Sequence, residues 1–231
     1  MATISIIHPS RGRALQALIT AKNWMGKAAE PVEYILSIDI DDDTELYKKA
    51  FKGLNVKVII NKNKSAVDAI NNAAKISVGN ILVVVSDDFD CPQVWDQEII
   101  NRTKDKTDWI AKTEDGIQSW MITLPIMDRA YYNRFGYVYH PGFLHMFCDT
   151  FMSCVADLLG KKIKLPIMFK HNHYSLGHNK KDAISLRADN TWSQGEQLFI
   201  HLARQNFGLR PEEIVGKIQS VEFSSWIKHR I

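Results

Sequence analysis

The sequence predicts an α/β fold in which a mostly parallel central sheet is flanked by helices. In the first hundred residues, short apolar runs alternate with segments whose apolar residues recur at helical spacing. The run Ile81–Val85 contains only branched apolar residues, which is typical of a strand buried on both faces of a parallel sheet. Because parallel strands need crossover connections, this alternation favours right-handed crossovers and a doubly wound sheet.

The first half of the chain supplies the elements of that alternation in order. Helices are expected where apolar residues share one face, as Leu15, Leu18 and Ile19 do. Ser65 is a candidate N-cap, and Gly79 is a stop signal before the next strand. The expected strands are Thr3–His8, Glu33–Ile40, Val56–Ile60 and Ile81–Val85, and the expected helices are Arg13–Trp24, Thr44–Phe51 and Ser65–Ser77.

The second half of the chain is less regular. Helices that end at a glycine are expected at Asp128–Phe135, Asp149–Leu159 and Thr191–Asn206, and a shorter helix at Asp96–Asn101. Strands are expected at Trp109–Lys112, Trp120–Leu124 and Lys164–His173, followed by a polar loop to about Asp189. No repeat or linker interrupts the chain, so we expect one domain over residues 1–231, with halves at 1–100 and 101–231.

Composition places the chain among ordinary soluble globular proteins. Of its 231 residues, 45% are hydrophobic and 24% are charged, and the formal net charge of +3 is too small to indicate nucleic-acid binding. No signal peptide is evident at the N-terminus, and no apolar stretch reaches the ~20 residues that span a bilayer. Cys91, Cys148 and Cys154 follow no metal-binding spacing, so we expect reduced thiols in a cytoplasmic protein.

The strand at Ile81–Val85 ends on a cluster of acids. Asp87, Asp88 and Asp90 place three carboxylates within four positions, and such mutual repulsion needs a cation to offset it. Ligands of open α/β sheets bind just beyond the carboxyl ends of the strands. Oxygen donors there suit Mg²⁺ or Mn²⁺ shared with substrate phosphates. The alternative is a solvated acidic turn before Pro92 in which an acid caps a helix, although one cap needs one acid.

Two other strand ends offer groups that could hold a nucleotide. Pro9, Ser10 and Arg11 follow the first strand, with Arg13 one step further, and Asp39 closes the second. Neither GxGxxG nor GxxxxGK[ST] occurs where a strand meets a helix, which disfavours a Rossmann dehydrogenase and a P-loop kinase. Each of these groups, taken alone, more often stabilises a turn. Because they are all expected on the same edge of one sheet, together they favour a nucleotide-binding site.

The order of these motifs resembles that of the GT-A glycosyltransferases, most closely family 2. The segments that carry the resemblance are Ile4–Arg13, Ser37–Asp39 and Ser86–Asp90, with an Asn-containing helix before the last. The likeness covers roughly residues 3–205 and is most specific in the first hundred. It implies a GT-A (Rossmann-like) fold and a metal-dependent, inverting transfer of sugar from a nucleotide sugar, with a UDP-sugar favoured, to a hydroxyl of a saccharide or other acceptor.

The resemblance implies roles for residues at matched positions. Asp39 would bind the base, usually uracil, and Asp87 would contact the ribose or the donor sugar. Asp88 would ligate the Mn²⁺ or Mg²⁺ that bridges the diphosphate, and Asp90 is a candidate second ligand because the register departs from a plain DxD. The other residues expected near the nucleotide are Pro9, Ser10, Arg11, Lys64, Ser65 and Asp68.

An inverting transfer also needs a general base that deprotonates the acceptor hydroxyl. The segment Gly142–Thr150 resembles the stretch that carries this base, and Asp149 is the candidate. From local sequence, an N-cap role for Asp149 is equally good. Asp128 and Asp115 are weaker candidates for the base.

The late region adds candidate ligands and ring platforms. His171 and His173 share one face of the expected strand, and the resemblance points to either as a metal ligand. Lys180 and Lys181 could neutralise the departing diphosphate, although a solvated loop is the more frequent role for such lysines. Aromatic side chains could stack on an acceptor sugar, although core packing is more frequent. They are Trp109, Trp120, Trp192, Tyr131, Tyr132, Tyr137 and Tyr139.

Two other functions stay open on the sequence. A nucleotidyltransferase that makes nucleotide sugars would use a related sheet, but its first loop usually carries more glycine than Pro9–Arg13, which has one. A non-catalytic nucleotide- or sugar-binding protein could also keep this fold. The oligomeric state is not readable from the sequence.

Overall fold

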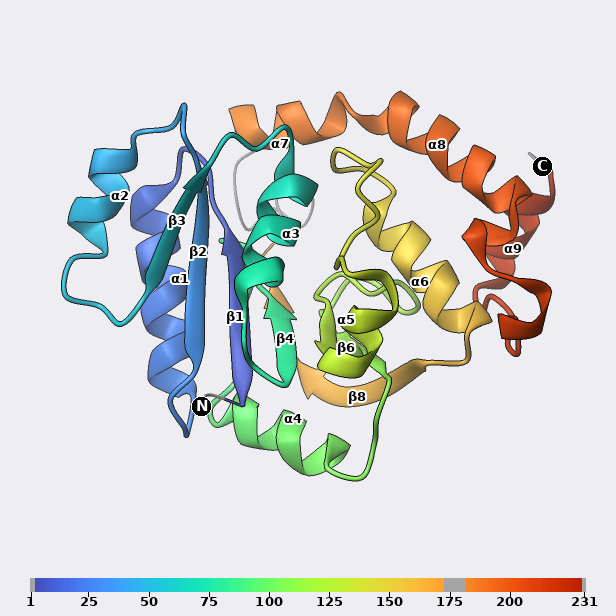
Figure 1. Ribbon diagram of the computed structural model, residues 1–231, viewed down its shortest axis with the longest axis horizontal. Coiled ribbons are helices and arrows are strands. Elements are labelled where there is room, and N and C mark those ends of the chain that lie inside the picture. The colour runs from blue at the N-terminus through green and yellow to red at the C-terminus, as the bar shows by residue number, and fades with distance from the viewer. Residues whose placement is uncertain (1–2, 173–181, 230–231) are drawn as a thin grey trace.

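The computed structural model describes residues 3–172 and 182–229, and its centre is a seven-stranded sheet (Figure 1). The strand order is β3-β2-β1-β4-β7-β6-β8. Among these strands only β7 is antiparallel to its neighbours, so the predicted, mostly parallel α/β fold is confirmed. The strands are β1 (Ile4–Pro9), β2 (Glu33–Asp39), β3 (Lys57–Asn61), β4 (Ile81–Val84), β6 (Ile110–Glu114), β7 (Ile126–Asp128) and β8 (Lys162–Met168).

Helices cover both faces of the sheet. Of the helices in residues 3–172 and 182–229, the first four precede β6, and the other five follow β7. The helices are α1 (Ala14–Lys27), α2 (Thr44–Ala50), α3 (Ala66–Ile76), α4 (Trp95–Thr103), α5 (Arg129–Phe135), α6 (Cys148–Leu158), α7 (Ala183–Asp189), α8 (Trp192–Arg204) and α9 (Val221–Lys228). Two short 3-10 turns, Asn206–Gly208 and Pro211–Glu213, lie between α8 and α9.

The alternation of side chains along each strand divides the core into two layers. Ile6 of β1 packs in the layer that contains Trp24 of α1, whereas Ile7 packs in the layer that contains Ile70 of α3. Both isoleucines are fully buried, and burial of each such side chain stabilises the fold by about 1.5–3 kcal/mol. The near-continuous apolar strands of the sequence follow from this two-sided burial.

The helix before β4 begins and ends as its residues predict. The Ser65 hydroxyl accepts the backbone N–H of Asp68 at 3.1 Å, and the Asp68 carboxylate accepts that of Lys64 at 3.0 Å, which forms a reciprocal cap at the start of α3. Gly79 then lies against β1, where a Cβ would come within 2.6 Å of the Ser5 nitrogen. Only glycine fits this close approach.

The expected strand Trp120–Leu124 is wrong. That segment has no strand conformation, and the pairing strand is the next one, β7, at residues 126–128. Pro125 separates the two, and its carbonyl accepts the Val84 N–H at 2.9 Å. The strand that joins the sheet therefore begins after Pro125, because proline lacks the N–H that a strand interior needs.

The region after α6 also differs from expectation. The single strand expected at Lys164–His173 is two strands, β8 and the short β9 (Lys170–His171), and β9 pairs with β5 (Phe89–Asp90) instead of continuing β8. The polar loop expected up to Asp189 includes α7, and α9 was not expected. Both helices are short, and tertiary contacts hold α9, because Ile227 is buried in the core and Phe223 packs on the rings of Trp120 and Phe199.

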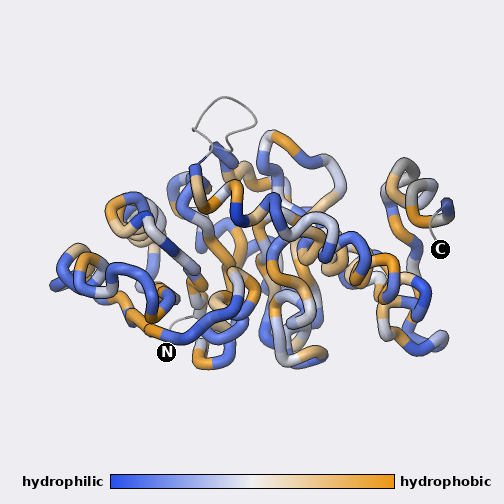
Figure 2. Tube along the Cα trace, turned by 90° about the horizontal axis from the view of Figure 1, so that it is seen from above, coloured by the Kyte–Doolittle hydropathy of each residue, from blue (hydrophilic) through white to orange (hydrophobic). Residues whose placement is uncertain are grey.

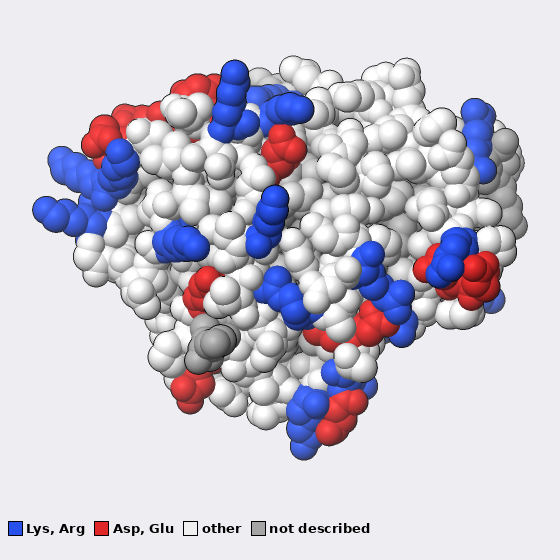
Figure 3. All heavy atoms as spheres, viewed as in Figure 1, with Lys and Arg blue, Asp and Glu red and all other residues white. Residues whose placement is uncertain are grey.

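The views from front and above agree on the arrangement of the ends. Figures 1 and 2 place the N-terminus by the sheet and the C-terminus at the far end of the molecule, beyond α8. In Figure 3, basic side chains gather around α2 and are interspersed with acidic ones, whereas the face over α6 and α8 carries few. In the described part of the chain, no helix combines the length and apolar character of a membrane span.

Candidate functional site

A cavity of about 910 Å³ lies beyond the carboxyl ends of β1 and β4. The start of α3 forms one wall and the start of α6 another, and the loop 117–123 and residues of α7, α8 and α9 also line the cavity. Figure 1 shows α7 and α8 running along this edge of the sheet. Gly195 lets α8 approach, because a Cβ there would lie 2.4 Å from the Met146 carbonyl oxygen. The chain thus brings both of its halves to one cavity.

Asp88 and His171 meet in this cavity as a carboxylate–imidazole pair. The antiparallel pairing of β5 with β9 places the His171 ring on Phe89, with centroids 4.1 Å apart, and sets Nε2 3.2 Å from Asp88 Oδ2. Burial would raise the pKa of Asp88, but the hydrogen bond and charge of His171, with the Ser86 hydroxyl, lower it to about 2. Asp88 is therefore ionised at any physiological pH.

Asp90 lies beside this pair and does not line the cavity. Its carboxylate accepts the side-chain amides of Asn23, at 2.5 Å, and Asn172, at 3.2 Å. Across residues 3–172 and 182–229, no group of three acidic, His or Cys side chains is arranged to hold a metal ion. Asp88 and His171 are therefore a pair of candidate ligands, one carboxylate and one imidazole, that line the same cavity.

Asp149 also lines the cavity, and its place in the helix excludes one interpretation. Phe147, in the left-handed region with φ 70°, is the N-cap residue of α6, and Asp149 lies in the first turn. Of the two interpretations that the sequence left open for Asp149, the N-cap of α6 is therefore excluded. Burial raises the pKa of Asp149, against hydrogen bonds from Thr150 and the charge of His145, which lower it. A carboxyl with a raised pKa is suited to accept a proton.

The two weaker base candidates have structural roles instead. Asp128 caps α5 by accepting the Tyr131 N–H at 2.8 Å, and it also accepts two backbone N–H groups from the residues before β6. Asp115 is buried and accepts the N–H groups of Ile117 and Gln118 at 2.9 and 2.8 Å. Neither lines the cavity.

The ends of β1, β2 and β3 carry a charged network next to the cavity. Arg11 pairs with Asp39 and donates two hydrogen bonds to Asp41, at 2.7 and 2.8 Å, while Asn63 donates to Asp39 at 2.7 Å. The hydrogen bond from Arg11 lowers the pKa of Asp41 to about 2. Asp39 and Arg11 thus share one edge, as predicted, but they do not line the cavity.

Asp87 is buried under the same edge, where two hydrogen-bonded chains converge on its carboxylate. The Nε2 atom of His8 lies 2.9 Å from Oδ1, and His8 Nδ1 lies 2.6 Å from the Tyr34 hydroxyl. Ser10 donates to Oδ2 at 3.2 Å, and its hydroxyl lies 2.9 Å from that of Tyr47. His8 was missed because a histidine inside an apolar strand gives no local signal of a partner 79 positions away.

The other residues expected at the nucleotide divide by position. Pro9 lines the cavity, whereas Lys64 and Asp68 form the cap of α3 and do not. His173, Lys180 and Lys181 lie outside the described residues. His145, which was not assigned a role, lines the cavity near Asp149 and is exposed. Its position within the segment Gly142–Thr150 was the available signal.

Most of the aromatic candidates are core residues. Trp109, Tyr131, Tyr132 and Tyr139 are buried. Trp120 lines the cavity, but its ring stacks on Phe223 with centroids 5.3 Å apart and its N–H donates to Asp157 at 2.6 Å. Trp192, at the start of α8, is 52% exposed and lines the cavity as well. Trp192 has the most exposed ring of these for contact with an acceptor.

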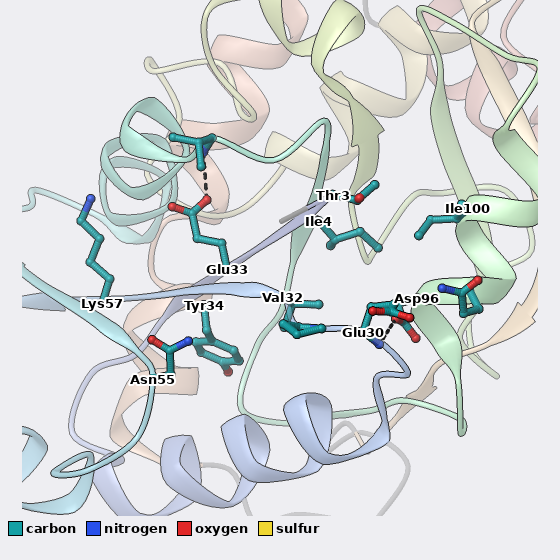
Figure 4. A pocket seen from close by; sticks show the side chains of 13 residues that line it. Thr3, Ile4, Glu30, Val32, Glu33, Tyr34, Asn55, Lys57, Asp96 and Ile100 are labelled. Carbon is teal, nitrogen blue, oxygen red and sulfur yellow. Dashed lines mark hydrogen bonds between the residues drawn. The ribbon is translucent and has the colours of Figure 1, made fainter. Parts of the chain in front are cut away.

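A second cavity, of about 870 Å³, lies at the opposite ends of β1 and β2 (Figure 4). Two of its three acids are engaged by the backbone: Asp96 accepts the N–H groups of Ala29 and Glu30 at 2.8 and 2.9 Å, and Glu33 accepts that of Val78 at 2.8 Å. These bonds join strand ends and helices, which is a structural role.

Comparison with known proteins identifies the fold. No protein-family model and no curated protein sequence matches the chain. The mannosyltransferase PcManGT from Pyrobaculum calidifontis, solved with GDP-Man and Mn²⁺, superposes with a TM-score of 0.60 at 14% identity over 73% of this chain and 56% of its own. S. aureus TarS with UDP-GlcNAc gives a TM-score of 0.56 at 14% identity over 73% of this chain and 57% of its own.

A third structure, S. aureus TarS with UDP, superposes with a TM-score of 0.55 at 14% identity over 92% of this chain and 77% of its own. The chain therefore spans little more than half the length of the first two structures. At this level of identity the likeness establishes the fold. The chain has the fold of the nucleotide-sugar glycosyltransferases, as the GT-A resemblance of its sequence predicted.

Proposed function

We propose that the chain transfers a sugar from a nucleotide-sugar donor to an acceptor hydroxyl. The observation that carries this proposal is the meeting of the Asp88–His171 pair and Asp149 in one cavity at the carboxyl edge of the sheet. The fold supports it, because PcManGT was solved with GDP-Man and TarS with UDP-GlcNAc. A UDP-sugar is the favoured donor, with residues 1–100 on the nucleotide side and 101–231 on the acceptor side of one domain.

The Asp88–His171 pair is the proposed metal site. A carboxylate oxygen and an imidazole nitrogen are both ligands that Mn²⁺ accepts, and PcManGT was solved with Mn²⁺. A bound divalent cation would offset the charge of the diphosphate as it leaves. Asp90 would join as a ligand only by exchanging its hydrogen bonds to Asn23 and Asn172. His173 stays a proposed alternative.

Asp149 is the proposed general base. The acceptor oxygen would form its bond to the anomeric carbon as the bond to the diphosphate oxygen breaks, and the acceptor proton would pass to the Asp149 carboxylate. Attack from the face opposite the diphosphate would invert the anomeric centre. Asp39 with Arg11 and Ser10, next to the cavity, would bind the base and ribose.

Thermal shift measurements with nucleotide sugars test the donor. UDP- and GDP-sugars with Mn²⁺ are expected to raise Tm, because a ligand present at 100 times its Kd stabilises the native state by about 2.7 kcal/mol. The shift should shrink when Mn²⁺ is replaced by EDTA. No shift with any nucleotide sugar in the presence of metal would contradict the proposal.

Replacement of the proposed base tests catalysis. Asp149→Asn should lower the rate of sugar transfer, or of donor hydrolysis, about 100-fold or more while donor binding persists. Asp105→Asn, which changes an exposed carboxylate outside the cavity, is the matched control. Unchanged transfer in Asp149→Asn would refute the base assignment. Nucleotide-sugar formation from a nucleoside triphosphate and a sugar phosphate would indicate a nucleotidyltransferase instead.

We also infer a reducing location and small-molecule partners. Cys91, Cys148 and Cys154 are buried and form no disulfide, as expected for a cytoplasmic protein. The formal net charge of +3 is small for a protein whose partner would be a nucleic acid.

A further inference from the structure

The cavity contains a cation, Arg13, that the sequence places beside the nucleotide-binding loop and to which the proposed chemistry gives no specific contact. Its acidic lining residues are Asp88, Asp149 and Asp189, and Arg13 is the one lysine or arginine among the described residues that line it. A diphosphate carries charge on both of its phosphates, and a single metal site leaves part of that charge uncompensated. Arginine is well suited to the remainder, because its planar fork binds phosphate oxygens in pairs.

The loop after β1 aims Arg13 into the cavity. Gly12, with φ of +65°, turns the chain between the edge network and α1, and Arg13 is the N-cap residue of α1. The neighbouring Arg11 points to the Asp39–Asp41 network instead. The two arginines of this loop therefore lie in different places. Arg11 contacts the end of β2, and Arg13 lines the cavity.

The guanidinium of Arg13 is held at one side and open at the other. Its Nε and Nη2 atoms donate to Asp182 Oδ2 at 2.8 and 2.6 Å, which joins the loop to the N-cap residue of α7. Its Nη1 atom lies 4.0 Å from Asp87 Oδ2, beyond hydrogen-bond distance. Among the described residues, no acceptor is bonded to Nη1.

Asp87 fixes the position of this open side. Asp87 is buried, both of its carboxylate oxygens accept hydrogen bonds from His8 and Ser10, and it does not line the cavity. Its backbone carbonyl accepts two further bonds from α1, from Gln16 and Thr20 at 3.1 Å each. Because both of its oxygens are already hydrogen-bonded, the Asp87 carboxylate is placed to orient the nearby Arg13 guanidinium and not to bind a ligand itself.

We propose that Arg13 binds the diphosphate of the donor through Nη1, and that Asp87, held by His8 and Ser10, is its positioning residue. This inference rests on the proposed function and assigns the leaving-group contact within it. It gives Asp87 an indirect role in place of direct contact with the ribose. Asp88 and His171 would then hold a metal ion that offsets part of the diphosphate charge, and Arg13 would offset the remainder.

Calorimetric titration of UDP and UMP, each with Mn²⁺, tests the contact, and GDP and GMP serve if the guanine nucleotides bind better. Arg13→Gln should weaken the diphosphate about tenfold or more and the monophosphate much less, so that the ratio of the two affinities falls. Arg13→Lys keeps the charge without the fork and should restore part of the ratio. Arg102→Gln, an exposed arginine of α4 paired with Glu98, is the matched control and should keep the wild-type ratio.

A second variant separates ligand contact from packing of α7. Asp182→Asn keeps a good N-cap for α7 but removes the charge that holds Arg13, so diphosphate affinity should stay equal or rise. A loss in Asp182→Asn as large as in Arg13→Gln would show that Arg13 acts by holding α7, and would overturn the inference. This variant and Arg13→Lys decide the question if Arg13→Gln does not fold.

The outcomes also distinguish this inference from the function on which it rests. Wild-type protein that binds no nucleoside diphosphate with Mn²⁺ would refute the proposed function and the inference together. Wild-type binding with an unchanged diphosphate-to-monophosphate ratio in Arg13→Gln would refute the role of Arg13 alone.

Discussion

The Asp149 carboxyl, the proposed general base, has a pKa that also affects the stability of the fold. Burial raises its pKa, so its ionised form costs folding free energy at neutral pH. A raised pKa means that the residue contributes stability only at pH values below its unfolded pKa, and that this contribution is lost as the pH rises through the folded pKa. Residues retained at such a cost are often found at functional sites.

Asp149→Asn is therefore expected to raise Tm at pH 8 while it lowers the rate of transfer. The asparagine oxygen can still accept the Thr150 N–H, which the carboxylate now accepts at 2.7 Å, and the buried charge is removed. In a chain of this length each kcal/mol corresponds to about 2–4 °C in Tm. A thermal melt of each variant at pH 8 measures this change in Tm. Asp128→Asn should lower Tm instead, because Asp128 accepts backbone N–H groups with both carboxylate oxygens and an amide has one acceptor oxygen, and the same sign for both variants would contradict this account.

The pH dependence of transfer should follow the same carboxyl. Because the pKa of Asp149 is raised, its protonation begins at a higher pH than for an ordinary aspartate, and kcat should begin to fall at a pH above the ordinary aspartate pKa of about 3.9 as the pH is lowered. Asp88, with its pKa at about 2, stays ionised at that pH. A pH profile of kcat at saturating donor measures the effect. A flat acid limb down to pH 4 would argue against Asp149 as the base.

At the scale of elements, the short pairing of β5 with β9 builds the metal-binding candidate. Two residues per strand bring His171 to Asp88 across 83 positions of sequence. The start of α3 forms another wall of the cavity, which Ala66, Val67 and Ile70 line behind the Ser65 cap. Each of these short elements matters because it places side chains at the cavity.

Loss of the α3 cap should be measurable as stability. Ser65→Ala removes the acceptor of the Asp68 N–H and is expected to cost about 1 kcal/mol, or about 2–4 °C in Tm. Chemical denaturation gives the free energy of unfolding directly. Ser193→Ala, at an exposed position in α8, should be neutral or slightly stabilising because alanine favours helix. Equal effects of the two substitutions would mean that the cap does not hold α3.

For the molecule as a whole, the cavity joins elements from both halves of the chain. Pro9 and Asp88 come from the first hundred residues, whereas Asp149, Trp192 and Phe223 come from α6, α8 and α9. A ligand that binds between them stabilises both sides, because it binds the native arrangement and not the unfolded chain.

Hydrogen exchange should report that coupling. With a nucleotide sugar and Mn²⁺ at saturating concentration, the backbone amides at the start of α3 and of α6 should exchange more slowly than in the free protein. Amides of α4, at the opposite end of the sheet, serve as the internal control. Protection confined to the first hundred residues would show that the donor does not reach Asp149.

The sequence by itself determined the class of fold and the sheet edge of the site. Apolar runs and helical spacing are local, so β1 to β4 and α1 to α3 were predicted nearly to their ends, and the acids of β4 and the loop of β1 fell on one edge because parallel strands share it. Where two local outcomes have similar energies, as at Trp120–Leu124 or at Asp149, sequence could not choose between them.

The tertiary structure decided which side chains of that edge meet. The sequence contained Asp87, Asp88 and Asp90 as near-equivalents, and only packing separates them: Asp87 is bonded to His8, Asp88 faces the cavity with His171, and Asp90 is held by Asn23. Each of these partners lies more than 60 positions away in the chain, so burial and hydrogen bonding across the fold, and not local propensity, assign the three acids their places.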